Sequence, residues 1–296
     1  MIRQIATHAR AFSLASAAVL GLASQAQAGW QLTFGDEFNG GSLDQSKWRL
    51  SDKWGNQTLA GNGEKQCYLP DAVAQADGKL VITARKQTTP AAQCKGAKED
   101  MTYASGEITT SGCNQWESGP QCRRLKSFGQ AYGYFEMRAK FAKGKGYWPA
   151  FWLMPTDGSW PPEIDVVEAL GHEPSKVYNT YHFNNAGGAH QQDGQAFDGQ
   201  DFTASFNTYG LDWKPGLMVW YVNGKEVFRH AGADVTSKPM YLLLNLAIGG
   251  NWPGNPDAST TFPGTMEVDY VRVYRRVEDG KPDDKPPTAE NAASIK

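Results

Sequence analysis

The segment from Val219 to Phe228 constrains the fold more than any other stretch of the chain. Two runs rich in β-branched and aromatic residues, Val219–Val222 and Lys225–Phe228, flank the dipeptide Asn223-Gly224. Asn-Gly readily adopts the positive φ angles of a type I′ turn, so the segment predicts a tight β-hairpin. A two-residue hairpin joins antiparallel strands, which indicates a fold with antiparallel pairing.

Further strand patterns recur along the chain between Gly- and Pro-containing turns. They lie at 79–85, 132–141, 240–248 and 266–274. No helical periodicity of useful length is found, and the segment 233–237 is long enough for one helical turn only. Many short strands separated by turn residues predict an all-β fold, a sandwich of two antiparallel sheets.

The two ends of the chain differ in composition from the middle. Residues 1–28 combine early arginines, an apolar run and a terminal Ala-Gln-Ala, which is typical of a secretory signal peptide. The apolar run is shorter than the roughly 20 residues that a membrane-spanning helix needs. Residues 277–296 are charged and proline-rich and predict a disordered tail or a linker. We therefore expect a secreted protein, extracellular or periplasmic, with one domain over 29–276.

The charge balance excludes one class of partner. The formal net charge is −2, and it becomes −4 when Arg3 and Arg10 are removed with the signal peptide. Phosphate binding needs clustered Lys and Arg, and no basic stripe occurs, so nucleic acid is not an expected partner. A neutral or weakly charged ligand fits better, and nothing in the sequence argues against a monomer.

Four cysteines remain after the signal peptide, and an even number in an exported chain predicts two disulfides. Cys113 and Cys122 flank a short loop containing Gly119-Pro120 and are the easiest pair to close. Cys67 and Cys94 are then left to form the second bridge. Zinc is the competing interpretation, but no C-x-x-C spacing occurs and no histidine lies near the four cysteines.

Three acidic residues lie close together in the strand-like segment Trp160-Pro-Pro-Glu163-Ile-Asp165-Val-Val-Glu168. Alternation along a strand places Glu163 and Asp165 on one face. Glu168 joins them only if a β-bulge at Val166-Val167 adds one residue. A retaining glycosidase needs one ionised carboxylate to attack the sugar and a second, protonated carboxyl to release the leaving group. The segment therefore predicts a catalytic strand.

Two other interpretations of this segment compete with catalysis. The acids could form a solvated strand edge, although Ile and Val between them and the nearby tryptophans argue against it. They could also bind Ca²⁺, although calcium sites usually draw on loop oxygens and carbonyls as well.

At this segment the sequence resembles glycoside hydrolase family sixteen, the group of laminarinases, lichenases and agarases. Glu163-Ile-Asp165-Val-Val-Glu168 matches the bulged E-x-D-x-x-E motif of that family. Four other segments resemble family segments in family order: Phe34–Gly40, Gly146–Pro155, Asn245–Gly254 and Val268–Tyr274. The resemblance covers nearly all of the chain from Trp30 to Tyr274.

The resemblance implies a concanavalin-like β-jelly-roll of two curved sheets with a concave substrate cleft. It also implies retention of configuration, with Glu163 as nucleophile, Asp165 as its assistant and Glu168 as general acid/base. The expected function is endo-acting hydrolysis of β-1,3- or β-1,3-1,4-glucan. The segment 161–182 is also similar to rhizobial exopolysaccharide depolymerases. The cysteine-bearing insertion 91–124 departs from plain laminarinases. A non-catalytic, lectin-like protein is the alternative outside enzymes.

Substrate contacts are expected from aromatic and polar residues around the acids. A sugar ring stacks its apolar face on indole, while its hydroxyls need polar partners. The candidates are Trp148, Trp152, Trp252, Trp160, His182, Asn245 and Glu64. His172, His190 and His230 carry no comparable signal.

The resemblance implies no cofactor for catalysis, but many family members hold one structural Ca²⁺ away from the cleft. The matching positions here are Glu37, Gly78 and Asp269. Carboxylate and carbonyl oxygens suit this hard cation.

Overall fold

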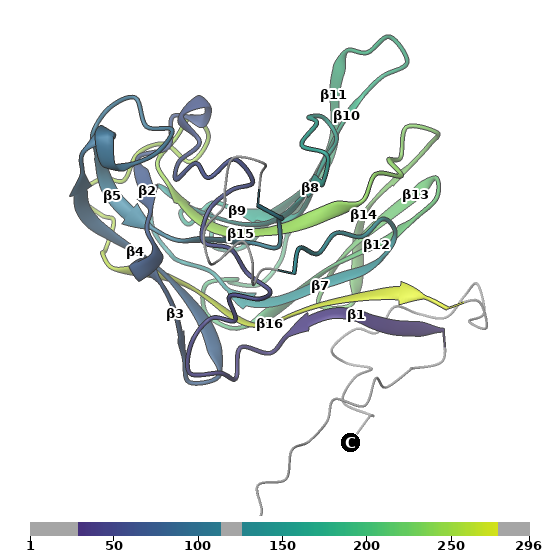
Figure 1. The fold of residues 1–296 in the computed structure, drawn as a ribbon, viewed down its shortest axis with the longest axis horizontal. Coiled ribbons are helices and arrows are strands. Elements are labelled where there is room, and N and C mark those ends of the chain that lie inside the picture. Colours follow the sequence, from purple (N-terminus) through teal and green to yellow (C-terminus); the bar gives the residue numbers. More distant parts are fainter. Residues whose placement is uncertain (1–28, 114–125, 278–296) are drawn as a thin grey trace, which may run out of the picture.

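The computed structural model describes residues 29–113 and 126–277 of the 296-residue chain (Figure 1). The predicted signal peptide, the tail from residue 278 onward and Cys122 lie outside the described residues. Within the described part, no helix is long and apolar enough to cross a membrane.

The described residues form two β-sheets, as the strand and turn pattern predicts. The larger sheet is ordered β14 (Lys225–Ala231), β13 (Leu217–Val222), β12 (Asn207–Lys214), β7 (Gly133–Lys140), β16 (Gly264–Arg276), β4 (Lys79–Thr89), β5 (Met101–Ser105) and β2 (Gln66–Tyr68), with β1 (Trp30–Asp36) paired to β16 and β3 (Val73–Ala76) to β4. The six-stranded sheet is ordered β11 (His190–Asp198), β10 (Lys176–Asn184), β9 (Glu163–Ala169), β8 (Tyr147–Pro155), β15 (Met240–Ile248) and β6 (Glu107–Thr109).

Helices are a minor part of the described chain. They are three short 3₁₀ turns, η1 (Ala60–Asn62), η2 (Pro70–Ala72) and η3 (Ala91–Gln93). The segment 233–237 forms turns and bends rather than the single helical turn considered from its sequence. The predicted hairpin is confirmed as β13 and β14, joined by Asn223 at φ 50° and Gly224 at φ 72°.

A continuous apolar core lies between the two sheets. β9 contributes Ile164, Val166 and Val167, all fully buried, and the larger sheet contributes Phe135 and Trp220 among others. Burying one such side chain stabilises the fold by about 1.5–3 kcal/mol. This burial orients β9, so its polar side chains point away from the core, toward the open face of the six-stranded sheet. Figure 1 shows the β10–β11 hairpin extending beyond the neighbouring strands of that sheet.

One of the two predicted disulfides lies within the described residues. Cys67 on β2 is bonded to Cys94 just after η3, with Cα atoms 5.9 Å apart. This pairing is confirmed. The predicted Cys113–Cys122 bridge stays a prediction, because Cys122 lies outside the described residues.

Candidate active site

A bulge in β9 brings the acidic side chains of this strand onto one face. Against both β8 and β10, the register of β9 skips one residue between Asp165 and Glu168. Val166 and Val167 are both buried in the core, whereas Glu163, Asp165 and Glu168 line the cleft. The bulge expected from the spacing of the acids is therefore confirmed.

Two side chains from other strands hold the backbone at the bulge. The carbonyl of Val166 accepts a 2.6 Å hydrogen bond from the Asn179 amide on β10. The preceding carbonyl, of Asp165, accepts a 2.9 Å bond from the Trp220 indole on β13 of the opposite sheet. A bulge disrupts the regular ladder of backbone hydrogen bonds, so side-chain donors are needed to satisfy buried carbonyls there.

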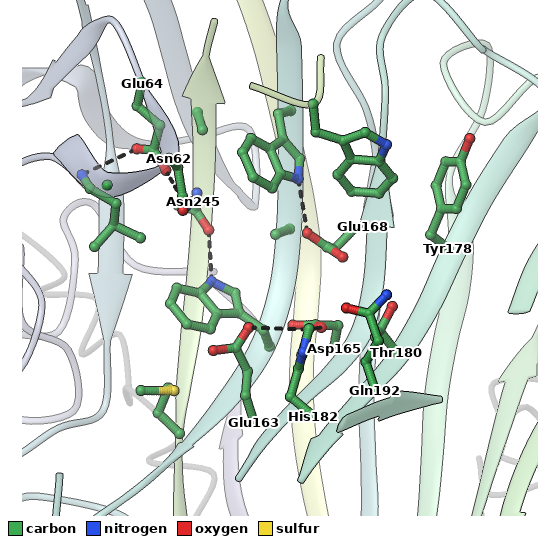
Figure 2. A pocket seen from close by; sticks show the side chains of 18 of the residues that line it. Asn62, Glu64, Glu163, Asp165, Glu168, Tyr178, Thr180, His182, Gln192 and Asn245 are labelled. Carbon is green, nitrogen blue, oxygen red and sulfur yellow. Dashed lines mark hydrogen bonds and ion pairs between the residues drawn. The ribbon is translucent and has the colours of Figure 1, made fainter. Parts of the chain in front are cut away.

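The cleft on the open face has a volume of about 1220 Å³ and crosses the six-stranded sheet. One end is bordered by Asn56, residues 58–62 and Gly96, beside the Cys67–Cys94 disulfide, and the other by residues 192–196 of β11. Every acid and substrate contact expected from the sequence lines this cleft: Glu64, Trp148, Trp152, Trp160, Glu163, Asp165, Glu168, His182, Asn245 and Trp252. Figure 2 shows Glu64 and Asn245 on one side of the acids and Thr180 and Gln192 on the other. Gly96 belongs to the cysteine-bearing insertion 91–124, so that insertion borders the cleft.

Two tryptophans hold the outer acids by hydrogen bonds as well as lining the cleft. The Trp148 indole donates to Glu168 Oε1 at 2.9 Å. The Trp160 indole donates to Glu163 Oε2 at 2.8 Å. An indole N–H fixes a carboxylate oxygen without supplying a proton that the reaction could use.

His182 lies beside the other two acids. Its Nε2 is 3.4 Å from Asp165 Oδ2 and 3.9 Å from Glu163 Oε1. Its Nδ1 is 3.1 Å from His190 Nε2 on the neighbouring strand β11. His182, expected from the sequence as a substrate contact, thus lies against two of the acids. His190, which carries no signal in the sequence, lies behind it.

Burial dominates the electrostatics of the three acids. It raises the pKa of Glu168 well above its usual range, and the negative charge of Asp165 raises it further. Burial and the charge of Glu163 raise the pKa of Asp165 well above its usual range. Burial also raises the pKa of Glu163, while His182 and the Trp160 hydrogen bond oppose the shift. All three pKa values are therefore raised, but His182 and Trp160 favour the ionised form of Glu163, whereas the charge of Asp165 disfavours that of Glu168. Acid-assisted displacement needs such a difference between its two carboxyl groups.

A chain of hydrogen bonds joins the substrate candidates at one side of the cleft. The Trp152 indole donates to Asn245 Oδ1 at 2.8 Å, and the Asn245 amide donates to the Tyr68 hydroxyl at 2.8 Å. The Tyr68 hydroxyl is 3.4 Å from Glu64 Oε2. Glu64 is itself buried, and burial raises its pKa. This chain fixes the Trp152 ring, whose face is then available to stack on a sugar.

An aromatic cluster lies next to Glu168. The Trp252 ring is 5.5 Å from Trp148 at 90°, and 4.7 Å from Tyr178 at 70°. Trp252 is 41% exposed, which agrees with a role in ligand contact rather than in core packing.

Several residues of the cleft were not predicted from the sequence. They are Tyr178, Asn179, Thr180, Gln192, Asp193 and, behind His182, His190. Alternation back from His182 along one strand would have found Thr180 and Tyr178. The polar strand β11 has no hydrophobic alternation, so nothing in its sequence marks Gln192 or Asp193.

The residues matched to the structural calcium site do not fit one in this arrangement. Both oxygens of Glu37 bind Arg272 at 2.8 Å, and the Asp269 carboxylate forms an ion pair with Arg138. Two guanidinium charges at these carboxylates would repel a divalent cation. Calcium binding through Glu37, Gly78 and Asp269 therefore stays a prediction of the resemblance alone.

The sequence matches a family of known enzymes. The family described as glycosyl hydrolases family 16 matches residues 68–272. An endo-1,3-1,4-beta-glycanase, EglC, of Rhizobium meliloti is 38% identical over 260 residues, which cover 82% of this chain and 51% of that protein. A glucan endo-1,3-beta-glucosidase of Cryptopygus antarcticus is 33% identical and is covered over 96% of its length. The chain thus spans about half the length of EglC.

Solved structures agree with this match. SCLam, a non-specific endo-beta-1,3(4)-glucanase, is 36% identical with a TM-score of 0.70, over 85% of this chain and 93% of that one. The laminarinase catalytic domain of Thermotoga maritima is 31% identical with a TM-score of 0.70, over 84% of this chain and 100% of that one. Both sequence and architecture therefore point to the same group.

Proposed function

The chain belongs to glycosyl hydrolase family 16, and we propose that it is a retaining, endo-acting hydrolase of β-1,3- or β-1,3-1,4-glucan. The observation that carries this proposal is the bulged strand β9, on which Glu163, Asp165 and Glu168 line one open cleft. A lectin-like protein would need the sugar contacts of this cleft but not its set of three acids.

In the proposed reaction the two outer acids have separate roles. The ionised carboxylate of Glu163 attacks the anomeric carbon while Glu168 protonates the departing glycosidic oxygen. Glu168, now ionised, takes a proton from water, which releases the sugar from Glu163 with its configuration retained. The raised pKa of Glu168 supports its role as the acid, because the proton must be present near neutral pH.

The charge of the cleft supports an uncharged polymer as the substrate. Among the described residues that line the cleft, five are Asp or Glu and none is Lys or Arg. Sulfated or uronate-rich chains would meet like charge there and would lack a basic partner. A neutral glucan can instead stack on Trp148, Trp152 and Trp252 and hydrogen-bond to the polar groups between them.

A bacterial exopolysaccharide is the second candidate for the substrate. Two proteins of Rhizobium meliloti named endo-1,3-1,4-beta-glycanases, EglC and ExsH, are 38% and 35% identical to this chain. The segment 161–182 is also similar to rhizobial exopolysaccharide depolymerases. The mechanism would be the same, so only the polymer distinguishes the two proposals.

The test incubates the protein with laminarin, barley mixed-linkage glucan, succinoglycan, agarose and κ-carrageenan. We expect a ladder of short oligosaccharides from laminarin or barley glucan, with the β-anomer appearing first in ¹H NMR. Glu163→Gln should release none, whereas Glu226→Gln, an exposed residue on β14, should match the unchanged protein. Cleavage of succinoglycan alone would select the second candidate. Release of product by Glu163→Gln at the unchanged rate would refute the catalytic assignment.

We also propose that the protein acts as a secreted monomer outside the cytoplasm. The Cys67–Cys94 disulfide supports this location, since such bonds persist in oxidising compartments. Mass spectrometry of protein purified from the culture medium or periplasm should find an N-terminus at Gly29. Retention of the full chain in the cytoplasm would contradict the proposal.

A further inference from the structure

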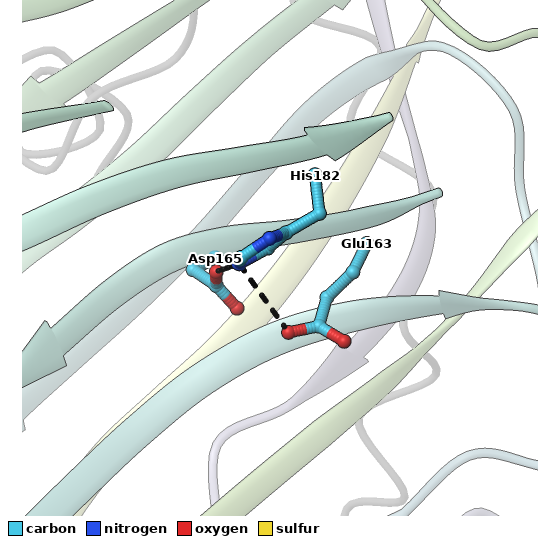
Figure 3. Close-up of side chains that lie close together, drawn as sticks. All are labelled: Glu163, Asp165 and His182. Carbon is cyan, nitrogen blue, oxygen red and sulfur yellow. Dashed lines mark ion pairs between the residues drawn. The ribbon is translucent and has the colours of Figure 1, made fainter. Parts of the chain in front are cut away.

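Three side chains of the cleft converge on one point (Figure 3). Glu163, Asp165 and His182 each offer one ligand atom, and these atoms lie within 4.8 Å of one another. Among residues 29–113 and 126–277, no other group of three His, Cys, Asp or Glu residues meets this condition. From this convergence we propose that the cleft binds a single Zn²⁺ or Cu²⁺ ion through Glu163, Asp165 and His182, and that the bound ion blocks hydrolysis.

The spacing of the atoms suits a small transition-metal ion. A tetrahedral Zn²⁺ with bonds of about 2.1 Å holds its ligand atoms about 3.4 Å apart. His182 Nε2 and Asp165 Oδ2 are 3.4 Å apart, and His182 Nε2 and Glu163 Oε1 are 3.9 Å apart. The Glu163 and Asp165 oxygens lie within 4.8 Å of each other, so the Glu163 side chain would move inward on binding. The ion would find one imidazole and two carboxylates, with its fourth position open to the cleft.

The second observation is an unsatisfied buried oxygen that points into the cluster. Asp165 is 3% exposed, and its Oδ2, the atom nearest His182 in their ion pair, takes part in no hydrogen bond. Glu163 accepts the Trp160 hydrogen bond on Oε2 and presents Oε1 to His182. A cation at this point would satisfy the buried Asp165 oxygen, which accepts no hydrogen bond from the protein.

The donor set also selects among metals. Imidazole with carboxylates suits Zn²⁺ and Cu²⁺, whereas Ca²⁺ and Mg²⁺ prefer six or more oxygen ligands or several retained waters. His182 is oriented for coordination because its other nitrogen contacts His190 at 3.1 Å, as an outer partner often does for a metal-bound histidine. The ion would occupy the lone pair with which Glu163 attacks the sugar, so binding and hydrolysis exclude each other.

A second histidine with two carboxylates provides a contrast within the same molecule. His230 contacts Asp193 Oδ2 through Nδ1 at 2.8 Å and Asp234 Oδ1 through Nε2 at 3.2 Å. Its two carboxylates lie on opposite sides of the ring, so no common point exists for an ion. The His182 cluster differs because one nitrogen faces both carboxylates.

The test measures zinc binding by isothermal titration calorimetry on the full chain, alongside hydrolysis of the polymer that it cleaves. We expect one Zn²⁺ per chain, inhibition competitive with polymer and recovery with EDTA, while Mg²⁺ and Ca²⁺ do not bind at this site. His182→Gln and Glu163→Gln should each weaken zinc binding at least about tenfold, because even outer-shell changes cost about 10–100-fold. Circular dichroism checks that both variants fold.

Two control variants sharpen the result. His172→Gln, at an exposed histidine outside the cleft, should leave both binding and inhibition unchanged. Loss of binding in His190→Gln but not in Glu163→Gln would place the ion on the other side of the imidazole and overturn the proposal. So would equal zinc affinity in His182→Gln and the unchanged protein. Because calorimetry reads binding without turnover, these results stand whether or not the proposed glucanase activity is found.

Discussion

A central strand in each sheet carries glutamates withdrawn from bulk water, but their oxygens are satisfied in different ways. On β7, Glu136 is 1% exposed and accepts a hydrogen bond on each oxygen, from Tyr134 at 2.9 Å and from Tyr270 at 2.8 Å. On β9, Glu163 and Glu168 each accept one indole hydrogen bond and line an open cleft.

Burial acts on both groups in the same direction. It raises the pKa of Glu136 to about 7, and it raises the pKa values of Glu163 and Glu168 too. A raised pKa therefore does not identify a catalytic acid by itself. The two groups differ in their free hydrogen-bonding capacity. Two tyrosines donate to the two oxygens of Glu136, whereas Glu163 and Glu168 each accept one indole bond and keep one oxygen for a substrate.

The largest expected effect is the difference in activity between a substitution on β9 and one on β7. Glu168→Gln should lower kcat about 10²–10⁴-fold, because the proton for the leaving oxygen is lost. Glu136→Gln should leave kcat within about threefold, since an amide can still bond both tyrosines. Initial rates on the cleaved polymer measure both variants. An equally large loss in Glu136→Gln would break the comparison.

A smaller effect concerns stability and pH. Because the pKa of Glu136 is raised on folding from its ordinary value near 4.5 to about 7, the folded state holds the proton more tightly. Its contribution to stability is present below about pH 4.5 and is lost as pH rises through 7, a change of about 3 kcal/mol. The difference in unfolding free energy between the unchanged protein and Glu136→Gln, from urea titrations at pH 5 and pH 8, should change by about 2.5 kcal/mol, since part of the contribution is already lost at pH 5. A constant difference would contradict it.

The smallest effect comes from removing one donor in each group. Tyr270→Phe should cost about 1–2 kcal/mol of stability without changing the pH profile of activity, because a buried Glu136 oxygen loses its hydrogen-bond donor.

Trp160→Phe should change stability little, since its ring is exposed, but it removes a bond that lowers the pKa of Glu163. The acid limb of kcat/KM should then move to higher pH, because Glu163 must be ionised. Movement to lower pH would exclude Glu163 as the ionised group.

Much of the fold was predictable because its signals are local. Alternation and turn residues predict β4, β7, β15, β16 and the β13–β14 hairpin, since each depends on neighbours in sequence. The spacing of Glu163, Asp165 and Glu168 also predicts the bulge, because three acids cannot share a face of that strand without an extra residue.

The remainder depends on contacts between distant segments. His190 reaches His182 only through the pairing of β10 with β11, and the polar sequence of β11 gives no hint of that register. Tyr270 reaches Glu136 only through the pairing of β16 with β7, which local patterns do not specify. Trp160 lies three residues before Glu163, so its indole contact with that carboxylate is local, but no sequence pattern marks it.

The bulge in β9 links the number of residues in that strand to the identity of Asn179 on the neighbouring strand β10. Deleting Val166 would leave Glu163, Asp165 and Glu168 at alternate positions, still on one face, and would let β9 pair regularly with β8 and β10. The deletion would, however, remove the Val166 carbonyl to which the Asn179 amide donates. The buried Asn179 amide would then lack its acceptor. A one-residue deletion in β9 would therefore need a companion substitution at Asn179, so an insertion or deletion here is coupled to a point change on another strand.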